Sequence, residues 1–290
     1  MSTASPAQIL REMLAQPGIV TAPGVYDHMS LGLAQRAGFK AFYASGYWNA
    51  ASALGEPDVG IAGASDFLAI FARYVAKTNS PIIADADTGF GSLTNLDRAV
   101  KAYQRAGIAA IQLEDQGFPK ICGHVGRAAS VSAEEMERRV KVAVEARGDG
   151  DMLIIARTDS RRTEGLEAAI ERLYAYTMAG ADILFLEGPQ SEEEIAAAAS
   201  ALERPLLLNA AHGGVTPILP PKRYEELGAK IVIFPAGAAL SAAYAAQRFY
   251  EGLASGDPNG SQAEMFDFAQ MSKMLGMDDV VAFQERHGAP

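Results

Sequence analysis

The sequence predicts a parallel α/β fold, a (β/α)8 TIM barrel, and three observations support this. Eight short apolar runs alternate with helical segments, as expected when helices connect parallel strands. The chain has 290 residues, of which 49% are hydrophobic and 21% charged, and this length and composition suit one barrel. Residues 22–27 lack the glycine pattern that opens a doubly wound nucleotide-binding sheet. We therefore expect one domain.

The elements follow from the apolar pattern, taken in chain order. The predicted strands are 18–24 with its turn, 40–44, 82–84, 110–113, 152–156, 182–186, 205–208 and 230–234. The predicted helices are 5–16, 27–37, 64–77, 94–105, 132–147, 165–179, 191–201 and 239–254, with two short helices up to 283. Residues 45–60 are expected to form a loop, and the charges of 132–147 a solvated face. The domain then divides into an N-terminal helix (1–17), the barrel (18–236) and closing helices (237–290).

Bulk charge and cysteine content restrict the possible partners and location. A formal net charge of −10 argues against nucleic acid as a partner, because phosphate binding needs a positive surface. A single cysteine excludes an internal disulfide and suits a reducing compartment. We expect no signal peptide and no membrane span, and hence a cytoplasmic protein. The apolar helices after residue 238 exceed what one barrel needs, which predicts an oligomer.

Acidic residues gather where two neighbouring strands end. Asp85 and Asp87 follow the third predicted strand, and Glu114 and Asp115 follow the fourth. The carboxyl ends of barrel strands carry the active site, so these side chains are expected to meet. Hard oxygen ligands suit Mg²⁺, with Mn²⁺ as the alternative, and zinc is disfavoured because the cysteine and histidines lack ligand spacing. The competing interpretation of Asp87 is an Asx turn.

Other strand ends carry groups that could bind and transform a carboxylate. The polar groups at the remaining strand ends are Tyr43 with Ser45, Arg157, Glu187, and Asn209 with His212. Arg157 is a planar fork that matches a substrate carboxylate, although it could instead pair with the acidic cluster. Cys122 lies in a Gly- and Pro-containing loop between Lys120 and His124, where nearby cations would lower the thiol pKa and make it a usable acid or base. Its alternative role is that of a small buried hydrophobic residue.

As an ordered set, these residues resemble the isocitrate lyase/phosphoenolpyruvate mutase superfamily over nearly the whole chain. The matching motifs are Pro-Gly-Val-Tyr-Asp at 23–27, Tyr-Ala-Ser-Gly at 43–46, Gly-Glu-Pro-Asp-Val-Gly at 55–60, Asp-Ala-Asp-Thr-Gly-Phe-Gly at 85–91, Leu-Glu-Asp-Gln at 113–116 and Ala-Arg-Thr-Asp at 156–159. The resemblance implies a homotetramer, a dimer of dimers whose eighth helix is swapped between subunits. It also implies Mg²⁺ near Asp85, with Asp87 and Glu114 binding directly or through water.

The loop at 120–124, Lys-Ile-Cys-Gly-His, resembles the signature of the carbon–carbon lyases in that superfamily. This branch includes isocitrate, 2-methylisocitrate and dimethylmalate lyases and oxaloacetate hydrolase, whereas the mutases and phosphonopyruvate hydrolases lack the cysteine. Two positions depart from the pattern. Ile121 replaces a second basic residue, and His212 stands near the position of a common glutamate.

The resemblance implies a small carboxylate substrate, an α-keto or 2-hydroxy acid, and a set of site residues. The expected catalytic residues are Cys122, Tyr43, Arg157 and Glu187; the expected substrate-binding residues are Ser45, Gly46, Asp58, Gly123, His124, Arg157, Asn209 and Thr216; the expected metal ligands are Asp85, Asp87 and Glu114. The predicted reaction is cleavage of a 2-hydroxy di- or tricarboxylate. The alternatives are oxaloacetate hydrolysis or decarboxylation, phosphonopyruvate-type carbon–phosphorus chemistry, and a barrel that has lost catalysis.

Overall fold

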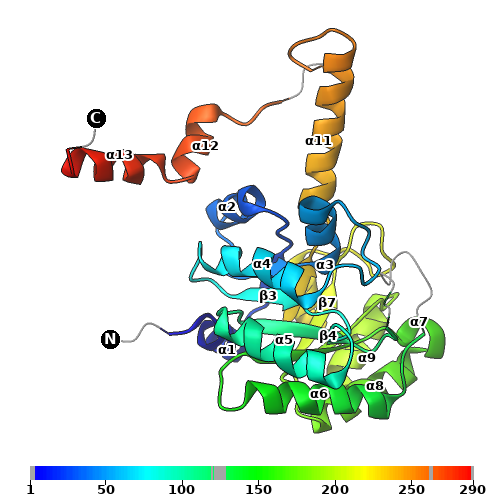
Figure 1. Cartoon of the computed structure of the whole chain (residues 1–290). Helices are drawn as coiled ribbons and strands as arrows, with labels where there is room; N and C mark the ends of the chain where they lie inside the picture. The colour runs from blue at the N-terminus through cyan, green and yellow to red at the C-terminus, as the bar shows by residue number, and fades with distance from the viewer. Residues whose placement is uncertain (1–3, 119, 121–128, 261–263, 289–290) are drawn as a thin grey trace. The chain divides into compact units, whose positions relative to one another are not determined.

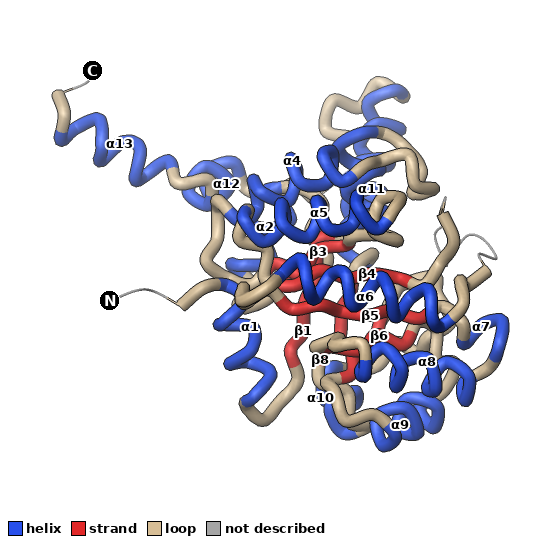
Figure 2. The backbone as a smooth tube through the Cα atoms, turned by 60° about the horizontal axis from the view of Figure 1, so that its bottom comes forward, coloured by secondary structure: helices blue, strands red, loops and turns tan. Residues whose placement is uncertain are grey.

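The computed structural model describes residues 4–118, 120, 129–260 and 264–288. The chain forms two compact units, Met1–Ala238 and Ala239–Pro290. The first unit contains a sheet of parallel strands with helices packed outside it (Figure 1, Figure 2).

The sheet of the first unit is a nearly closed barrel of eight parallel strands. They are β1 (Val20–Pro23), β2 (Phe42–Ala44), β3 (Ile82–Asp85), β4 (Ala110–Glu114), β5 (Leu153–Thr158), β6 (Ile183–Leu186), β7 (Leu206–Asn209) and β8 (Ile231–Phe234). From β2 to β8 each strand pairs with the next one in chain order, and β8 also pairs with β1. Between β1 and β2 a single bridge joins Gly24 to Tyr43, and the Val25 amide donates to the Tyr43 carbonyl over 2.9 Å. The predicted (β/α)8 barrel is confirmed.

Helices connect the strands. In the first unit they are α1 (Pro6–Ala15), α2 (His28–Arg36), α3 (Gly46–Asn49), the π-helical turn η1 (Ala50–Leu54), α4 (Ala64–Val75), α5 (Leu93–Arg105), α6 (Ala133–Arg147), α7 (Arg161–Glu164), α8 (Leu166–Met178), α9 (Glu192–Ala201) and α10 (Pro221–Glu226). Ser5 and Asp27 cap α1 and α2 by accepting backbone N–H groups that the first helical turn leaves without partners. Both helices begin one residue after their predicted starts.

The strands alternate between two apolar layers. Ile83, Ile155, Phe185 and Leu207 belong to the cluster that fills the barrel interior, and their strand neighbours pack against the outer helices. Ala7 and Leu10 of α1 join the interior cluster beside the first residues of several strands. Helix α1 therefore closes the N-terminal end of the barrel. The opposite end is left for polar groups.

Two expectations about local structure were wrong. Residues 46–54 of the predicted loop are helical, as α3 and η1, because Asn49 is fully buried and anchors them, whereas residues 55–60 form no helix or strand, as expected. The Asn49 amide donates to the carbonyls of Val25 and Ser45, and its oxygen accepts from the Tyr74 hydroxyl at 2.6 Å. Helix α6 does not present all of its charges to solvent, since Arg139 is buried.

The second unit consists of helices. It contains most of α11 (Gly237–Ala254), then α12 (Phe268–Met274) and α13 (Met277–Arg286). Large apolar side chains are exposed along these helices, among them Tyr244, Tyr250, Phe268 and Phe283. Over the described part of the chain, none of the helices has the length and apolarity needed to cross a membrane.

Candidate active site

The inward-facing positions of the strands change from apolar to polar at their C-terminal ends. The alternation that places Ile83 inside the barrel places Asp85 inside two residues later. The same spacing of two residues places Arg157 after Ile155 and Asn209 after Leu207 on the inner face of the barrel. The local period of the sequence thus directs these side chains to one end of the barrel, as predicted.

Asp85 lies against the start of α3. The Gly46 amide donates to Asp85 Oδ2 over 3.0 Å, and the Asp87 amide donates to Asp85 Oδ1 over 3.0 Å. A Cβ on Gly46 would lie 2.9 Å from Asp85 Oδ2 and 3.3 Å from Asp87 Oδ1, so the position admits only glycine without displacement. Asp87 itself has φ +48°, a left-handed conformation that aspartate tolerates better than most residues.

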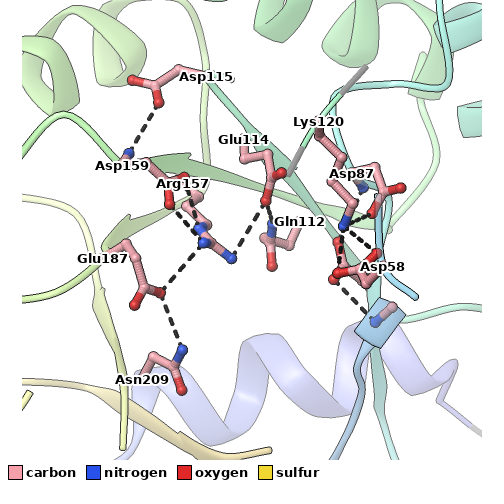
Figure 3. A network of polar contacts seen from close by, with 12 residues as sticks. Asp58, Asp87, Gln112, Glu114, Asp115, Lys120, Arg157, Asp159, Glu187 and Asn209 are labelled. Atoms are coloured by element: carbon pink, nitrogen blue, oxygen red, sulfur yellow. Dashed lines mark hydrogen bonds and ion pairs between the residues drawn. The ribbon is translucent and has the colours of Figure 1, made fainter. Parts of the chain in front are cut away.

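Lys120 is buried between two of the predicted site carboxylates (Figure 3). Its Nζ lies 2.5 Å from Asp87 Oδ1 and 2.8 Å from Asp58 Oδ1. The sequence assigned this lysine to the surroundings of the Cys122 thiol, whereas the structure places its charge on Asp58 and Asp87. Asp58, expected to bind substrate, is thus connected to the predicted metal ligands through an ion pair.

Arg157 connects β5 to the acidic groups on both sides (Figure 3). Its Nε and Nη2 donate to the two oxygens of Asp159 over 3.0 and 2.7 Å. Nη1 lies 3.4 Å from Glu114 Oε2, and Nη2 lies 3.6 Å from Glu187 Oε2. These two separations are longer than a charge-assisted hydrogen bond of about 2.8 Å, so the guanidinium retains donor capacity towards the centre of the site.

Gln112 bridges two predicted site residues inside the barrel. The Tyr43 hydroxyl donates to Gln112 Oε1 over 2.6 Å, and Gln112 Nε2 donates to Glu114 Oε2 over 3.4 Å. Gln112 is fully buried. Since the Tyr43 hydroxyl occupies the amide oxygen, the amide nitrogen is turned towards Glu114.

The remaining predicted residues fall into three groups. Asn209 Nδ2 donates to Glu187 Oε2 over 3.1 Å, which joins both residues to the Arg157 network. Ser45 and Thr216 are buried, but no contact to that network is seen for their side chains. Cys122, Gly123 and His124 lie outside the described residues.

Burial and mutual repulsion shift the ionisation of the carboxylates. Burial raises the pKa of Asp87 to about 7, and although Lys120 opposes this shift, Asp85 and Asp58 add to it. Burial also raises the pKa of Glu114 well above its usual range, although Arg157 and Lys120 oppose it. Burial alone would lower the pKa of Lys120, but the surrounding carboxylates raise it above its ordinary value. The site is therefore an acidic cluster that a further cation would stabilise.

The donor chemistry fits a hard divalent cation, although the described side chains do not form a complete cage. Within the described ranges no group of three His, Cys, Asp or Glu side chains converges to hold an ion, so the direct three-carboxylate cage is not formed. Yet Glu114 Oε1 is a buried oxygen without a hydrogen bond to the described residues, and Asp87 Oδ1 is a buried oxygen that is paired with Lys120. Mg²⁺ commonly binds through one or two carboxylates and keeps several waters, and this arrangement suits that mode.

Comparison with known proteins identifies the family. Residues 10–254 match the model of the phosphoenolpyruvate phosphomutase family. The chain belongs to the PEP mutase/isocitrate lyase superfamily. The resemblance found in the sequence motifs is thereby confirmed.

Two curated relatives of this superfamily member are named as lyases. The chain is 40% identical over 272 residues to 2,3-dimethylmalate lyase of Eubacterium barkeri, which covers 93% of this chain and 94% of the relative. It is 46% identical over 231 residues to 2-methylisocitrate lyase of Aeropyrum pernix, with 79% of this chain and 74% of the relative covered. These relatives support the predicted lyase class.

Solved structures of the superfamily share the whole fold. A 2,3-dimethylmalate lyase structure has a TM-score of 0.92 at 36% identity and covers 99% of this chain and 97% of its own. Oxaloacetate acetylhydrolase with 3,3-difluorooxalacetate gives 0.91 at 35% identity, covering 99% and 98%. Phosphonopyruvate hydrolase with oxalate and Mg²⁺ gives 0.85 at 28% identity, covering 98% and 99%.

Sequence reasoning missed several residues that build the site. Gln112 had a visible signal, because it is a polar residue within an apolar strand run. Asp159 was named in a motif but given no role. Arg139 had no signal, since its helix is rich in charges; its Nη1 donates to the carbonyls of Glu114 and Gln116 over 3.3 and 2.8 Å.

Proposed function

We propose that this protein is a Mg²⁺-dependent carbon–carbon lyase that cleaves a 2-hydroxy di- or tricarboxylate, such as 2-methylisocitrate or dimethylmalate. The products would be an α-keto acid and a second carboxylate. The main observation in support is that the Arg157 guanidinium and buried carboxylate oxygens lie together at the C-terminal ends of the strands. The names of the lyase relatives support the reaction class.

The proposed metal site uses Asp85, with Asp87 and Glu114 acting directly or through water, and Mn²⁺ as an alternative ion. Glu114 Oε1, which accepts no hydrogen bond from the described residues, and the raised pKa values of Asp87 and Glu114 support a cation there. When bound, Mg²⁺ would act as a Lewis acid that polarises the oxygens of the substrate. The Mg²⁺ complex of the phosphonopyruvate hydrolase relative also supports this assignment.

The proposed reaction reverses a Claisen-type addition. Arg157 would hold the carboxylate of the 2-hydroxy acid end, with Ser45, Gly46, Asp58, Asn209 and Thr216 as the other described binding residues. A base takes the hydroxyl proton, the hydroxyl carbon becomes a carbonyl, and the electron pair of the broken carbon–carbon bond goes to the leaving carboxylate as its enolate. Arg157 would stabilise charge that develops in this step.

The burial of Tyr43 helps to decide which residue acts as the base. Burial raises the pKa of Tyr43 well above 10, so its phenol stays protonated at neutral pH and suits a hydrogen-bond donor. This does not favour Tyr43, one of the expected catalytic residues, as the base. Glu187, half-buried beside Arg157 and Asn209, is the carboxylate that we assign to this step.

The enolate would be protonated by Cys122, an assignment that rests on the sequence of the loop at 120–124. Cys122→Ala should keep oxalate and Mg²⁺ binding within about twofold and lower kcat by at least 10²-fold, the usual contribution of a general acid. Calorimetry with oxalate and a keto-acid assay measure the two effects. Full turnover by this variant would eliminate the proposed mechanism.

Hydrolysis or decarboxylation of oxaloacetate is the competing function, favoured by the likeness to oxaloacetate acetylhydrolase. Incubating the protein with 2-methylisocitrate, dimethylmalate, oxaloacetate and phosphonopyruvate, with separate detection of pyruvate and oxalate, distinguishes the candidates. Turnover of oxaloacetate alone would replace the lyase proposal, and turnover of phosphonopyruvate would indicate carbon–phosphorus chemistry.

We also propose a homotetramer in which the helices after residue 238 pack against other subunits. The exposed apolar side chains of α11, α12 and α13 support this assembly. Sedimentation equilibrium of the full chain tests it, and a monomer at micromolar concentration would refute it. The cytoplasmic location stays a prediction.

A further inference from the structure

Asp115 is a buried carboxylate that the proposed reaction does not use. It follows Glu114 at the end of β4, and its side chain is 0% exposed. Because side chains alternate along a strand, Glu114 faces the barrel centre and Asp115 faces the outer helices. Figure 3 shows the two carboxylates pointing in different directions from consecutive residues.

Among the described residues, the hydrogen-bond and ion-pair partners of the Asp115 carboxylate are all donors. Its Oδ2 accepts from Thr158 Oγ1 over 2.6 Å and from the Tyr176 hydroxyl over 2.8 Å. Its Oδ1 accepts from the Asp159 amide over 3.0 Å, and Arg172 Nη1 lies 3.6 Å from Oδ2. A buried carboxylate with this many donors is held in one orientation.

These contacts fix the backbone that carries Arg157. The Asp115 amide also donates to the Arg157 carbonyl over 3.2 Å. Asp115 therefore binds three consecutive residues of β5 and its exit: the carbonyl of Arg157, the hydroxyl of Thr158 and the amide of Asp159. Asp159 in turn holds the Arg157 guanidinium by two hydrogen bonds of 3.0 and 2.7 Å.

We propose that Asp115 is a positioning residue, which sets the orientation of the Arg157 guanidinium through the backbone and carboxylate of Asp159. This inference deepens the proposed function and rests on the assignment of Arg157 to the substrate carboxylate. Without the anchor at Asp159, the guanidinium would turn towards Glu114 or Glu187, which lie 3.4 and 3.6 Å away. A bidentate site is sensitive to such a rotation, because both hydrogen bonds must align at once.

The contacts supply matched variants. Asp115→Ala removes the acceptor for the Asp159 amide. Asp115→Asn keeps an oxygen at that position and turns its amide nitrogen towards the Thr158 and Tyr176 hydroxyls, which can also accept a hydrogen bond. Tyr176→Phe removes a hydrogen bond to Oδ2 of the same carboxylate but leaves the Asp159 contact in place. Tyr176→Phe therefore controls for the loss of stability in this region.

The test is calorimetric titration of oxalate in the presence of Mg²⁺, with kcat and KM on the substrate found by the screen. Asp115→Ala should weaken oxalate binding and raise KM at least tenfold. Tyr176→Phe and Asp115→Asn should stay within about threefold of wild type. Equal affinity for oxalate in Asp115→Ala and Tyr176→Phe would overturn the inference, because it would show a structural role only.

Two further measurements keep the result decisive. If Asp115→Ala does not fold, Asp159→Asn tests the same route, and wild-type oxalate affinity in that variant would refute it. A crystal structure of Asp115→Ala needs no ligand and should show the Arg157–Asp159 pair broken; an unchanged pair would refute the inference. Failure of wild-type protein to bind oxalate would instead count against the proposed function, and the crystal structure would still decide the role of Asp115.

Discussion

Replacing Gly46 by alanine tests the packing on which the proposed metal site depends. The new methyl group would lie 2.9 Å from Asp85 Oδ2 and 3.3 Å from Asp87 Oδ1. The φ of Gly46 is not positive, so the backbone conformation itself tolerates alanine. The perturbation is therefore steric and acts on two predicted ligands at once.

The magnitude follows from the size of the clash. An ordinary carbon–oxygen contact is about 3.4 Å, so Asp85 Oδ2 must retreat by roughly 0.5 Å, or α3 must shift by that amount. Overpacking of this kind costs about 1–3 kcal/mol of stability. A displacement of 1 Å at a reacting centre can cost about 10²-fold, so we expect kcat/KM to fall about 10- to 100-fold. The affinity for Mg²⁺ with oxalate should fall by a similar factor.

The assay combines Mg²⁺ titration in the presence of oxalate with thermal unfolding. The control is Gly63→Ala, because Gly63 has φ −97° and the nearest atom to its Cβ position is 3.7 Å away. We expect that control to keep wild-type Mg²⁺ affinity. If Gly46→Ala binds Mg²⁺ as tightly as wild type, then Asp85 and Asp87 do not hold the ion in the arrangement described.

Two further predictions concern the ionisation of the same carboxylates. Burial raises the pKa of Asp87 from 3.8 to about 7, so the folded metal-free protein binds a proton on this carboxyl more tightly than the unfolded chain does. The contribution of Asp87 to the free energy of unfolding therefore falls as pH rises from about 4 to 7. Asp87→Asn should therefore gain stability relative to wild type by up to about 1.4 kcal/mol per pH unit between pH 5 and 7, measured by urea unfolding; a constant difference would contradict the assigned pKa. Lys120→Met leaves Asp58 and Asp87 without their cation and should cost about 3–5 kcal/mol at pH 8, with less loss at pH 6 and partial recovery on adding Asp58→Asn. Equal losses at the two pH values would show that neither carboxyl takes up a proton.

Most of the fold could be predicted from local patterns. The apolar runs placed every strand of the barrel, because strands buried on both faces have near-continuous apolar sequences. The segment after β2 was missed, because its helical form depends on the burial of Asn49 against Val25 and Tyr74, which lie far apart in the sequence. Local propensity gives no information on such contacts.

The sequence predicted which residues form the candidate site but not which charged side chains pair with one another. Asp85, Glu114 and Arg157 stand at strand ends, and the two-residue alternation of a strand directs them into one end of the barrel. The roles of Lys120 and Arg139 were not predictable, since each acts through a contact with a distant element. The predicted ligand and substrate roles stay predictions, and the part of the site at 121–124 lies outside the described residues.

The sequence by itself determined the barrel, the superfamily and the edge of the sheet where the chemistry gathers, because these follow from periods of two and 3.6 residues and from short motifs. Only the tertiary structure decided which charges neutralise one another. Lys120 pairs with Asp58 and Asp87, and Arg157 is held by Asp159. Ion pairing depends on distances of a few ångströms between side chains from separate strands and loops, and packing of the whole barrel sets those distances.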